Sequence, residues 1–139
     1  MVVLDTNVIS ELMLPAPSTQ VVRWMDLQPG LSLWTTSINV YEIRYGLRSM
    51  PLGKKRSSLT VLFERWLTEV IQQRIVSFDT AAAQCAADLA AGRKVKGRPS
   101  DPRDTMIAGI VLASRATLAS RNVKHFDDIA KSVVNPWEA

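Results

Sequence analysis

The sequence predicts an α/β fold of three layers, in which a parallel central sheet of about five strands is covered by helices on both faces. Short apolar or β-branched runs recur along the 139 residues, and longer segments with helical periodicity separate them. A helical segment between two strands returns the chain to the same end of the sheet, so neighbouring strands run parallel. The chain is 47% hydrophobic and 22% charged, as in ordinary globular proteins, and its length indicates one domain over residues 1–139.

Each expected strand is rich in apolar or β-branched residues and is bounded by polar or turn residues. The expected strands are Val2–Asp5, Leu31–Thr36, Arg74–Asp79, Thr117–Asn122 and a short one near Ser132–Val134. The clearest helix starts near Ser57, where apolar residues that include Trp66 recur at i+3 and i+4 spacing up to Ile71. Alanine-rich Thr80–Ala91 is a second expected helix, and the basic stretch GRKVKGRPS that follows is expected to be a connection.

Charge and composition limit the environment and partners of the chain. The net charge of +4 and the pI of about 9.6 favour an anionic partner such as nucleic acid, although mildly basic proteins without such a partner are common. No apolar run approaches the ~20 residues that span a bilayer, and the start lacks the basic region and cleavage site of a signal peptide. The lone Cys85 cannot form an internal disulfide. We therefore expect a cytoplasmic protein that does not contact a membrane.

Four polar side chains stand where sites form in parallel α/β proteins, at the carboxyl ends of strands and in the helices that flank them. Asp5 ends the first strand in MVVLDTNVISEL. Glu42 lies about one turn into the helix after the second strand, in TTSINVYEIRYGL, with Thr36 or Ser37 as N-cap. Asp104 lies in the first turn of the helix before the fourth strand, and Asn122 ends that strand. The topology therefore predicts that these four side chains share one site.

Each of these residues also has an ordinary structural interpretation. Asp101 as N-cap, Pro102 at the first helical position and Asp104 three residues after the cap make a good helix start without any function. Glu42 would be a solvent-facing helix acid paired with an arginine of its own helix. Asp5 and the amide at the end of the fourth strand would be strand-end or turn residues. Only the combination of the four favours a site.

Together the acids fit a hard cation. Carboxylate oxygens are the ligands that Mg²⁺ and Mn²⁺ prefer, and Mg²⁺ keeps several waters, so a few protein ligands suffice. Acids brought close together repel one another, and a divalent ion compensates that repulsion. Zinc is disfavoured because one histidine, His125, and one cysteine cannot build a usual zinc site.

Four segments carry a resemblance to a known family. In order along the chain, VVLDTNVISEL, INVYEIRYGL, DTMIAGIVLA and SRNVKHF resemble the PIN-domain ribonucleases of the VapC toxin type, from type II toxin–antitoxin systems. The terminal NPW is similar to the branch called FitB-like. The resemblance covers essentially the whole chain. It implies a PIN-like fold and a Mg²⁺-dependent endoribonuclease, with Mn²⁺ as a substitute.

Carried over position by position, the resemblance implies that Asp5, Glu42 and Asp104 bind the metal. Thr6 and Ser120 stand where such proteins often carry supporting hydroxyls. The fourth acidic position of many PIN domains corresponds to Asn122, which would orient a water or the substrate. An amide there removes one negative charge, so a second ion would come with the substrate phosphate rather than be held by protein alone.

Basic residues flank the segments that carry these acids. Arg98, Arg103 and Arg121 are the expected RNA contacts, since arginine holds phosphates without reading sequence. The GKKR stretch at residues 53–56 is expected to be a solvated surface.

The resemblance also implies partners. Early helices of such toxins commonly form a groove for the cognate antitoxin, which makes contacts of Leu12, Val21, Trp24 and Met25, although core packing explains each equally well. The family implies a homodimer and allows a larger toxin–antitoxin assembly with DNA bound through the antitoxin.

Two other interpretations remain to be weighed. A haloacid-dehalogenase phosphatase would place a second aspartate two residues after the first, where this chain has Asn7. A PIN-type binding module that acts with a DNA-binding partner, its nuclease activity weak or lost, is the stronger rival. Asn122 keeps that interpretation open, and the three intact acids oppose it.

Overall fold

The five strands form one parallel sheet in the order β3-β2-β1-β4-β5, in a computed structural model that describes residues 1–139. The strands are β1 (Val2–Leu4), β2 (Leu33–Thr36), β3 (Ile75–Val76), β4 (Thr117–Ala119) and β5 (Val133–Val134). β1 is central, because it pairs with β2 on one side and with β4 on the other. The predicted parallel sheet is confirmed, with strands shorter than the apolar runs that predicted them.

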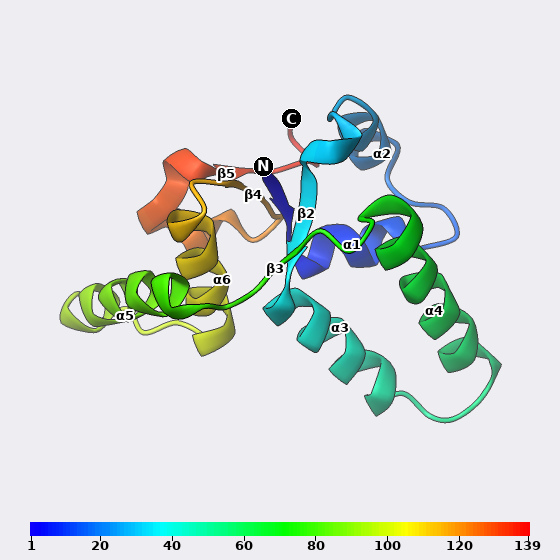
Figure 1. The fold of residues 1–139 in the computed structure, drawn as a ribbon, viewed down its shortest axis with the longest axis horizontal. Coiled ribbons are helices and arrows are strands. Elements are labelled where there is room, and N and C mark those ends of the chain that lie inside the picture. The colour runs from blue at the N-terminus through cyan, green and yellow to red at the C-terminus, as the bar shows by residue number, and fades with distance from the viewer.

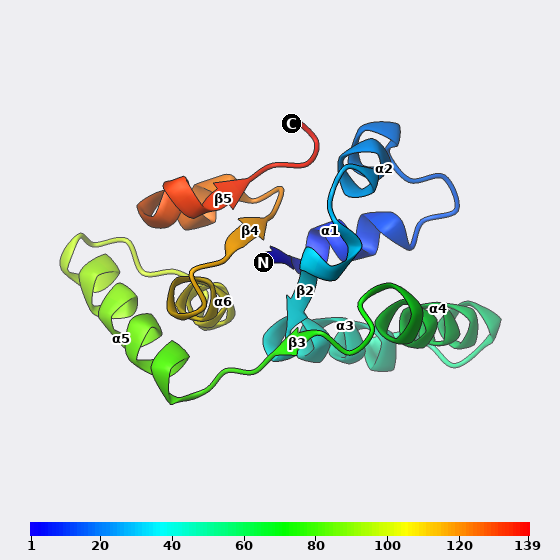
Figure 2. The same cartoon turned by 45° about the horizontal axis from the view of Figure 1, so that its top comes forward.

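Helices occupy both sides of this sheet, as Figures 1 and 2 show. The helices are α1 (Thr6–Leu12), α2 (Thr19–Asp26), α3 (Ser37–Ser49), α4 (Lys54–Arg65), α5 (Thr80–Val95) and α6 (Pro102–Ala113). Shorter turns are η1 (Gly30–Ser32), η2 (Trp66–Val70), which has π-helical geometry, and the kinked 3₁₀ segment η3 (Val123–Ser132). In both ribbon views α5, α6 and η3 lie on one side, and α1, α2 and α4 on the other. No helix is both long and apolar enough to cross a bilayer.

Side-chain caps start most of the helices. The Thr36 hydroxyl accepts a hydrogen bond from the Asn39 amide at the start of α3, and Asp101 accepts one from the Arg103 amide at the start of α6, with Pro102 in the first turn. The predicted caps are therefore confirmed, with Thr36 rather than Ser37 at α3. Asp5 caps α1 in the same way, through the Thr6 amide.

Two boundaries differ from the sequence prediction. α4 begins at Lys54 rather than near Ser57, so the basic residues after Gly53 form its first turn, with Lys54 and Lys55 exposed and Arg56 half-buried. α5 continues to Val95, so much of the basic stretch expected to be a connection is helical. Alanine, arginine and lysine are strong helix formers, and the last turn of a helix favours cations, which explains the longer α5.

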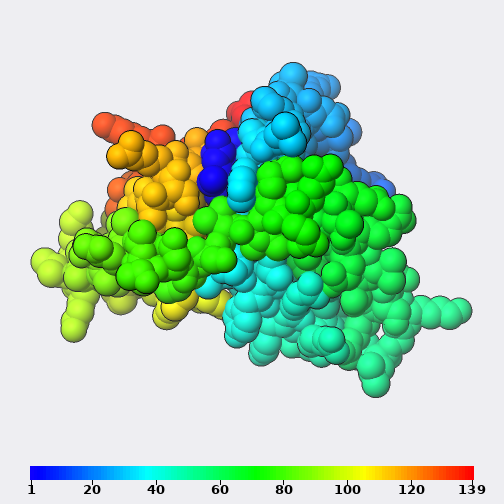
Figure 3. Space-filling model, in the orientation of Figure 1, coloured from blue at the N-terminus to red at the C-terminus, as the bar shows by residue number.

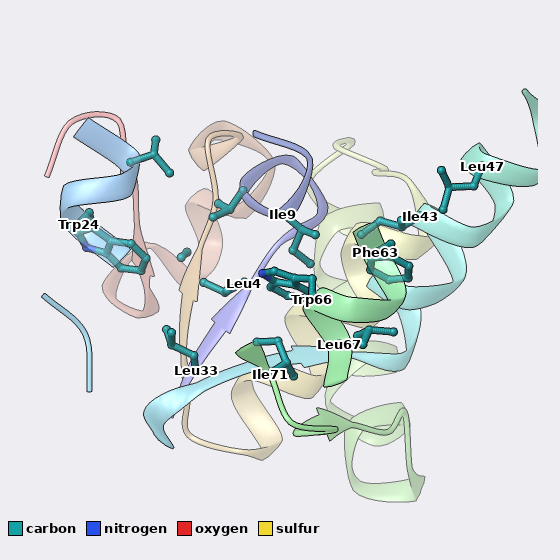
Figure 4. Packing of buried hydrophobic residues seen from close by; sticks show 13 residues of the cluster. Leu4, Ile9, Trp24, Leu33, Ile43, Leu47, Phe63, Trp66, Leu67 and Ile71 are labelled. Atoms are coloured by element: carbon teal, nitrogen blue, oxygen red, sulfur yellow. The ribbon is translucent and has the colours of Figure 1, made fainter. Parts of the chain in front are cut away.

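The sheet separates two hydrophobic cores, because successive strand residues point to opposite faces. Leu4 belongs to a core of 13 residues with α1, α2, α3, α4 and η2, whereas Val3 belongs to a core of 8 residues with α6 and η3. Figure 4 shows Trp66 directed toward Leu4 and Ile9 in the larger core, and Phe63 beside Ile43. The predicted core position of Trp66 is confirmed.

The space-filling view shows which parts of the surface these helices form. In Figure 3, α5 (yellow-green) projects on one side and the connection from α3 to α4 (blue-green) on the other. The chain that leads through β3 to α5 passes between them. β3 is the edge strand on this side of the sheet, and because it has only two residues it offers a short edge for pairing with another chain.

Candidate active site

Asp5 is the central acid of the candidate site. It follows β1, the middle strand, and it is 4% exposed. Its Oδ1 accepts hydrogen bonds from the Thr6 amide at 2.8 Å and the Asn39 side-chain amide at 3.0 Å. Its Oδ2 accepts one from the Ser120 hydroxyl at 2.7 Å. A buried carboxylate is expensive unless it is hydrogen-bonded, and here three elements of the fold supply donors.

Glu42 is joined to Asp5 through a short chain of polar groups. The Thr6 hydroxyl donates to Glu42 Oε1 at 3.1 Å and accepts from the Asn39 amide at 3.0 Å. Asn39 has no exposed surface, and its side-chain oxygen Oδ1 accepts a hydrogen bond from the Thr36 hydroxyl at 2.6 Å. Because Asn39 and Glu42 lie three residues apart on α3, they share one face of that helix. This face therefore carries both the acid Glu42 and a hydrogen-bond donor to Asp5.

Asp104 approaches from the other side of the sheet, in the first turn of α6. Its Oδ2 lies 3.2 Å from Nδ1 of His125 in η3, and its side chain is 21% exposed. His125 is 57% exposed, so it is a surface side chain that contacts an acid of the site rather than a buried ligand.

The three acids influence one another electrostatically. Burial raises the pKa of the Asp5 carboxyl, although the hydrogen bonds to it act in the opposite direction. Burial is also the largest cause of the raised pKa values of Glu42 and Asp104, and the negative charge of Asp5 raises both further. The charge of Asp5 therefore disfavours loss of a proton from Glu42 and from Asp104, in addition to the effect of burial, and a cation would relieve this repulsion.

The chemistry of the donor set fits Mg²⁺ or Mn²⁺, which take oxygen ligands. No group of three or more His, Cys, Asp or Glu side chains stands close enough together to hold a metal in this arrangement. Asp5 instead directs both carboxylate oxygens to protein donors, and Glu42 directs one to Thr6. The donors are hydroxyls and amides, which can hold a ligating carboxylate in place as well as a free one.

The two predicted supporting hydroxyls, Thr6 and Ser120, both contact the acids. The Ser120 hydroxyl also accepts from the Asn122 backbone amide at 3.1 Å, which folds the chain back at the end of β4. Asn122 itself is exposed, and its side chain makes no hydrogen bond to any of the three acids. The backbone of Asn122 is thus tied to Ser120, a residue that contacts Asp5, whereas the side-chain amide of Asn122 is exposed to solvent.

Each arginine expected to bind RNA is engaged with a protein group. Arg98 donates to Asp127 at 2.6 Å, and both residues line the same pocket as Asp104. Arg103 contacts Asp101 at 3.1 Å and lies 3.8 Å from Glu42 Oε2. Arg121 lies over the ring of Trp137, 4.8 Å from its centre, and therefore links the end of β4 to the C-terminal segment.

The residues expected to contact an antitoxin differ in exposure. Val21 has no exposed surface and Trp24 is 8% exposed, and both belong to the larger core. Leu12 and Met25 are partly buried and pack against that core. Val21 and Trp24 are therefore core residues, which is the alternative to an antitoxin contact that the sequence left open.

Two hollows border the site. A pocket of about 350 Å³ reaches Thr6 and Glu42 and is otherwise lined mainly by apolar residues of α1, α3 and α4, among them Met13, Ile43 and Leu59. A larger pocket of about 660 Å³ lies between α5, α6 and η3 and includes Asp104 but neither Asp5 nor Glu42. The acids therefore lie between two concave surfaces of different character, one mainly apolar and one polar.

The combination of a parallel sheet with acids at the ends of its strands defines a class of protein. The PIN domain family matches residues 2–132, and the chain belongs to this family. It is 37% identical over its full length to "Plasmid stability protein StbB" of Pseudomonas syringae pv. tomato, and the match covers 100% of each chain. It is 36% identical to "VapC ribonuclease Y4jK" of Sinorhizobium fredii and 32% identical to "Toxin FitB" of Neisseria gonorrhoeae, with 99% of each chain covered. The predicted membership of the VapC and FitB group is thus confirmed.

Solved structures give the same result for the fold. The "Crystal Structure of FitAcB from Neisseria gonorrhoeae" superimposes with a TM-score of 0.86 at 32% identity, covering 100% of both chains. The "Structure of FitAB bound to IR36 DNA fragment" superimposes with a TM-score of 0.88 at 32% identity, covering 99% of this chain and 96% of that one.

Two residues of the site escaped the sequence analysis. Asn39 resembles an ordinary polar residue in the first turn of a helix, and only its position three residues before Glu42 points to the site. Arg93 resembled part of a solvated basic stretch but is 7% exposed. Its guanidinium donates to both carboxylate oxygens of Asp128, to Ser100 and Thr105, and to the His125 carbonyl. The sequence held no signal for this role, because the charged partner Asp128 lies 35 residues away along the chain.

Proposed function

We propose that this protein is a metal-dependent endoribonuclease toxin that a cognate antitoxin neutralises. The observation that carries the proposal is the buried Asp5 carboxylate at the end of the central strand, which hydroxyl and amide donors hold and which Asn39 and Thr6 link to Glu42. The negative charge of Asp5 raises the pKa of both Glu42 and Asp104. Asp5, Asp104 and Glu42 would hold Mg²⁺ or Mn²⁺, Glu42 directly or through water. When bound, such an ion polarises a phosphate and lowers the pKa of an attacking water.

Other residues of this chain would orient the metal-binding acids and hold the RNA beside them. Ser120, Thr6 and Asn39 keep the carboxylates oriented, so little reorganisation is needed during reaction. The exposed Asn122 amide would orient a water or a phosphate oxygen by hydrogen bonding. Arg103 and Arg121 border the acids and would contact phosphates, whereas Arg98 would do so only after release from Asp127.

The names of relatives support the proposed partners. One relative is named a VapC ribonuclease and another a toxin, and the FitAB structure is a complex bound to DNA. By analogy we propose that this chain forms a homodimer and binds an antitoxin that can attach the complex to DNA. Leu12 and Met25 lie at the surface of the larger core and could contact an antitoxin without any change in that core. Val21 and Trp24 are buried, so they could contact an antitoxin only if the core opened.

The decisive experiment is cleavage of a pool of structured cellular RNAs by the purified, partner-free protein with Mg²⁺, with Mn²⁺ and with a chelator. Asp104→Asn is the matched control, because it preserves side-chain size and removes only the charge. Discrete products that require metal and that the variant does not make would support the proposal. No cleavage by folded protein with either metal would favour the alternative, a PIN-type binding module that acts with a DNA-binding partner.

A further inference from the structure

Two tyrosines lie exposed on α3 beside the proposed active site. Tyr41 is 56% exposed and Tyr45 is 60% exposed. Their rings stack, with centres 6.2 Å apart and planes inclined by 25°. A stacked pair four residues apart stabilises a helix only slightly, so helix stability does not explain why two large aromatic rings remain in water.

The position of the pair relates it to the acids. Tyr41 directly precedes Glu42 on α3, and Tyr45 lies one turn further from the site. Arg103 lies 3.8 Å from Glu42.

Positive charge lies at both ends of the aromatic pair. Positions 41, 45 and 48 follow the i, i+4, i+7 spacing of one helix face, so the exposed Arg48 continues the surface that the two rings begin. Arg103 stands at the end near the acids. Exposed rings flanked by cations match a single nucleic-acid strand, in which bases with stacking faces alternate with phosphates.

We propose that Tyr41 and Tyr45 form a stacking platform for an unpaired base of the RNA substrate, with Arg103 and Arg48 contacting the neighbouring phosphates. This inference rests on the proposed nuclease function and adds a preference for unpaired RNA. Stacking tolerates any base, because every base has a π face, so the platform would hold a strand at the acids without reading its sequence.

The test measures RNA affinity in an Asp104→Asn background, so that the strand is bound but not cut. The probes are a fluorescent single-stranded adenosine oligonucleotide and a strand of equal length without bases. Combined Tyr41→Ala and Tyr45→Ala substitutions should weaken binding of the adenosine strand about 5- to 100-fold. The same substitutions should leave the strand without bases unaffected, because it offers nothing to stack.

Two control variants separate stacking from loss of surface. Tyr41→Phe with Tyr45→Phe keeps both rings and should retain the affinity of the parent for the adenosine strand. Leu31→Ala removes a side chain that is 78% exposed on η1 and should change neither affinity. Light scattering of the alanine variant reports whether the pair instead joins two copies of the chain.

The outcomes distinguish the two proposals. Equal affinity of parent and alanine variant for the adenosine strand, while the wild-type protein still cuts RNA, would overturn the platform and leave the nuclease intact. A change of oligomeric state with unchanged RNA affinity would overturn it in favour of an interface between copies. Failure of the wild-type protein to bind or cut any strand would refute both.

Discussion

Asn39 shows how much of the site depends on residues that are not acids. Its amide donates to both Asp5 and Thr6, and through Thr6 it reaches Glu42. It is fully buried, so water cannot replace it. A site of this kind holds its carboxylates through neutral partners, which fix direction without neutralising charge.

Replacement of Asn39 by alanine should therefore affect both stability and catalysis. The change leaves Asp5 and the Thr36 hydroxyl each without one buried partner, which lowers the free energy of unfolding by about 1–3 kcal/mol. Denaturant unfolding measures the first effect and metal-dependent cleavage the second. Gln84→Ala is the control, since it removes an amide side chain that is exposed on α5, away from these hydrogen bonds. A stable Asn39→Ala protein with full cleavage activity would contradict this account.

Asp104 allows metal binding to be tested without measuring catalysis. Its pKa is raised by burial and by the charge of Asp5. A raised acid pKa means that the folded state loses stability as pH rises from 3.8 to the folded value. At neutral pH, Asp104→Asn should therefore raise the Tm of the metal-free protein, because it removes an unfavourable charge.

The same variant should lose most of the stabilisation that the metal provides. Mg²⁺ at about 100 times its Kd would stabilise the wild-type protein by about 2.7 kcal/mol. It would stabilise the Asp104→Asn variant far less, because the variant has lost one ligand. Differential scanning calorimetry with and without chelator measures both changes. Equal Mg²⁺ stabilisation of the two proteins would remove Asp104 from the ligand set.

Among the elements, α6 meets its neighbours at an unusually close contact. A Cβ added at Gly109 would lie 2.6 Å from the Ala82 carbonyl oxygen and 2.7 Å from the Ala86 Cβ on α5. Backbone cannot move aside as a flexible side chain can. Gly109→Ala should therefore force α5 and α6 apart and destabilise the protein by about 1–3 kcal/mol, despite the better helix propensity of alanine. Gly92→Ala is the control, since nothing lies within 4 Å there. Urea denaturation should show the loss for Gly109→Ala alone.

The end of α6 offers the opposite kind of change. Arg115 has a φ of 52°, in the left-handed region, where the Ala116 amide bonds the Val111 carbonyl and the Arg115 amide bonds the Leu112 carbonyl. This pattern usually contains glycine. Arg115→Gly should therefore stabilise the protein by up to about 1 kcal/mol. Thermal unfolding measures the effect. Arg65→Gly should instead destabilise, because Arg65 has right-handed helical backbone angles where α4 passes into η2.

The sequence predicted the helices, strands and caps more completely than it predicted the residues of the candidate site. The caps of α3 and α6 could be predicted, because capping depends on residues within four positions of each other. The end of α5 could not, because the basic residues there suit both a helix terminus and a solvated loop. Asp5, Glu42 and Asp104 could be proposed from topology, whereas Asn39 and Arg93 could not, because burial turned ordinary polar residues into partners across the fold.

Across the whole molecule, Arg93 ties together segments on one side of the sheet. It joins the end of α5 to the connection before α6, to α6 itself and to η3. Its bidentate pair with Asp128 is strongly shielded, since the Arg93 side chain is 8% exposed. Loss of one partner from such a buried pair costs about 3 kcal/mol or more, because the other charge remains buried.

This pair should govern part of the acid sensitivity of the protein. The hydrogen bond from Arg93 lowers the pKa of Asp128 below its ordinary value of 3.8. A lowered acid pKa contributes stability that is present above pH 3.8 and is lost as pH falls through the folded value. Asp128→Asn should therefore reduce stability at neutral pH and flatten its decline below pH 4. Asp127→Asn is the matched control, because its pair with Arg98 is exposed. Parallel acid titration of unfolding would settle the comparison.

The central place of β1 has a consequence for a chain still being made. The backbone amide of Asp5 bonds the Ala119 carbonyl, and its carboxylate accepts from the Ser120 hydroxyl, which is made 115 residues later along the chain. β2 and α3 can pack beside Asp5 earlier, but until Ala119 and Ser120 have been made β1 lacks its β4 neighbour and Asp5 lacks both of these hydrogen bonds. The acidic cluster is therefore completed only when the segment that carries Asp104 and Ser120 has been synthesised, which would delay the activity of the proposed nuclease during translation.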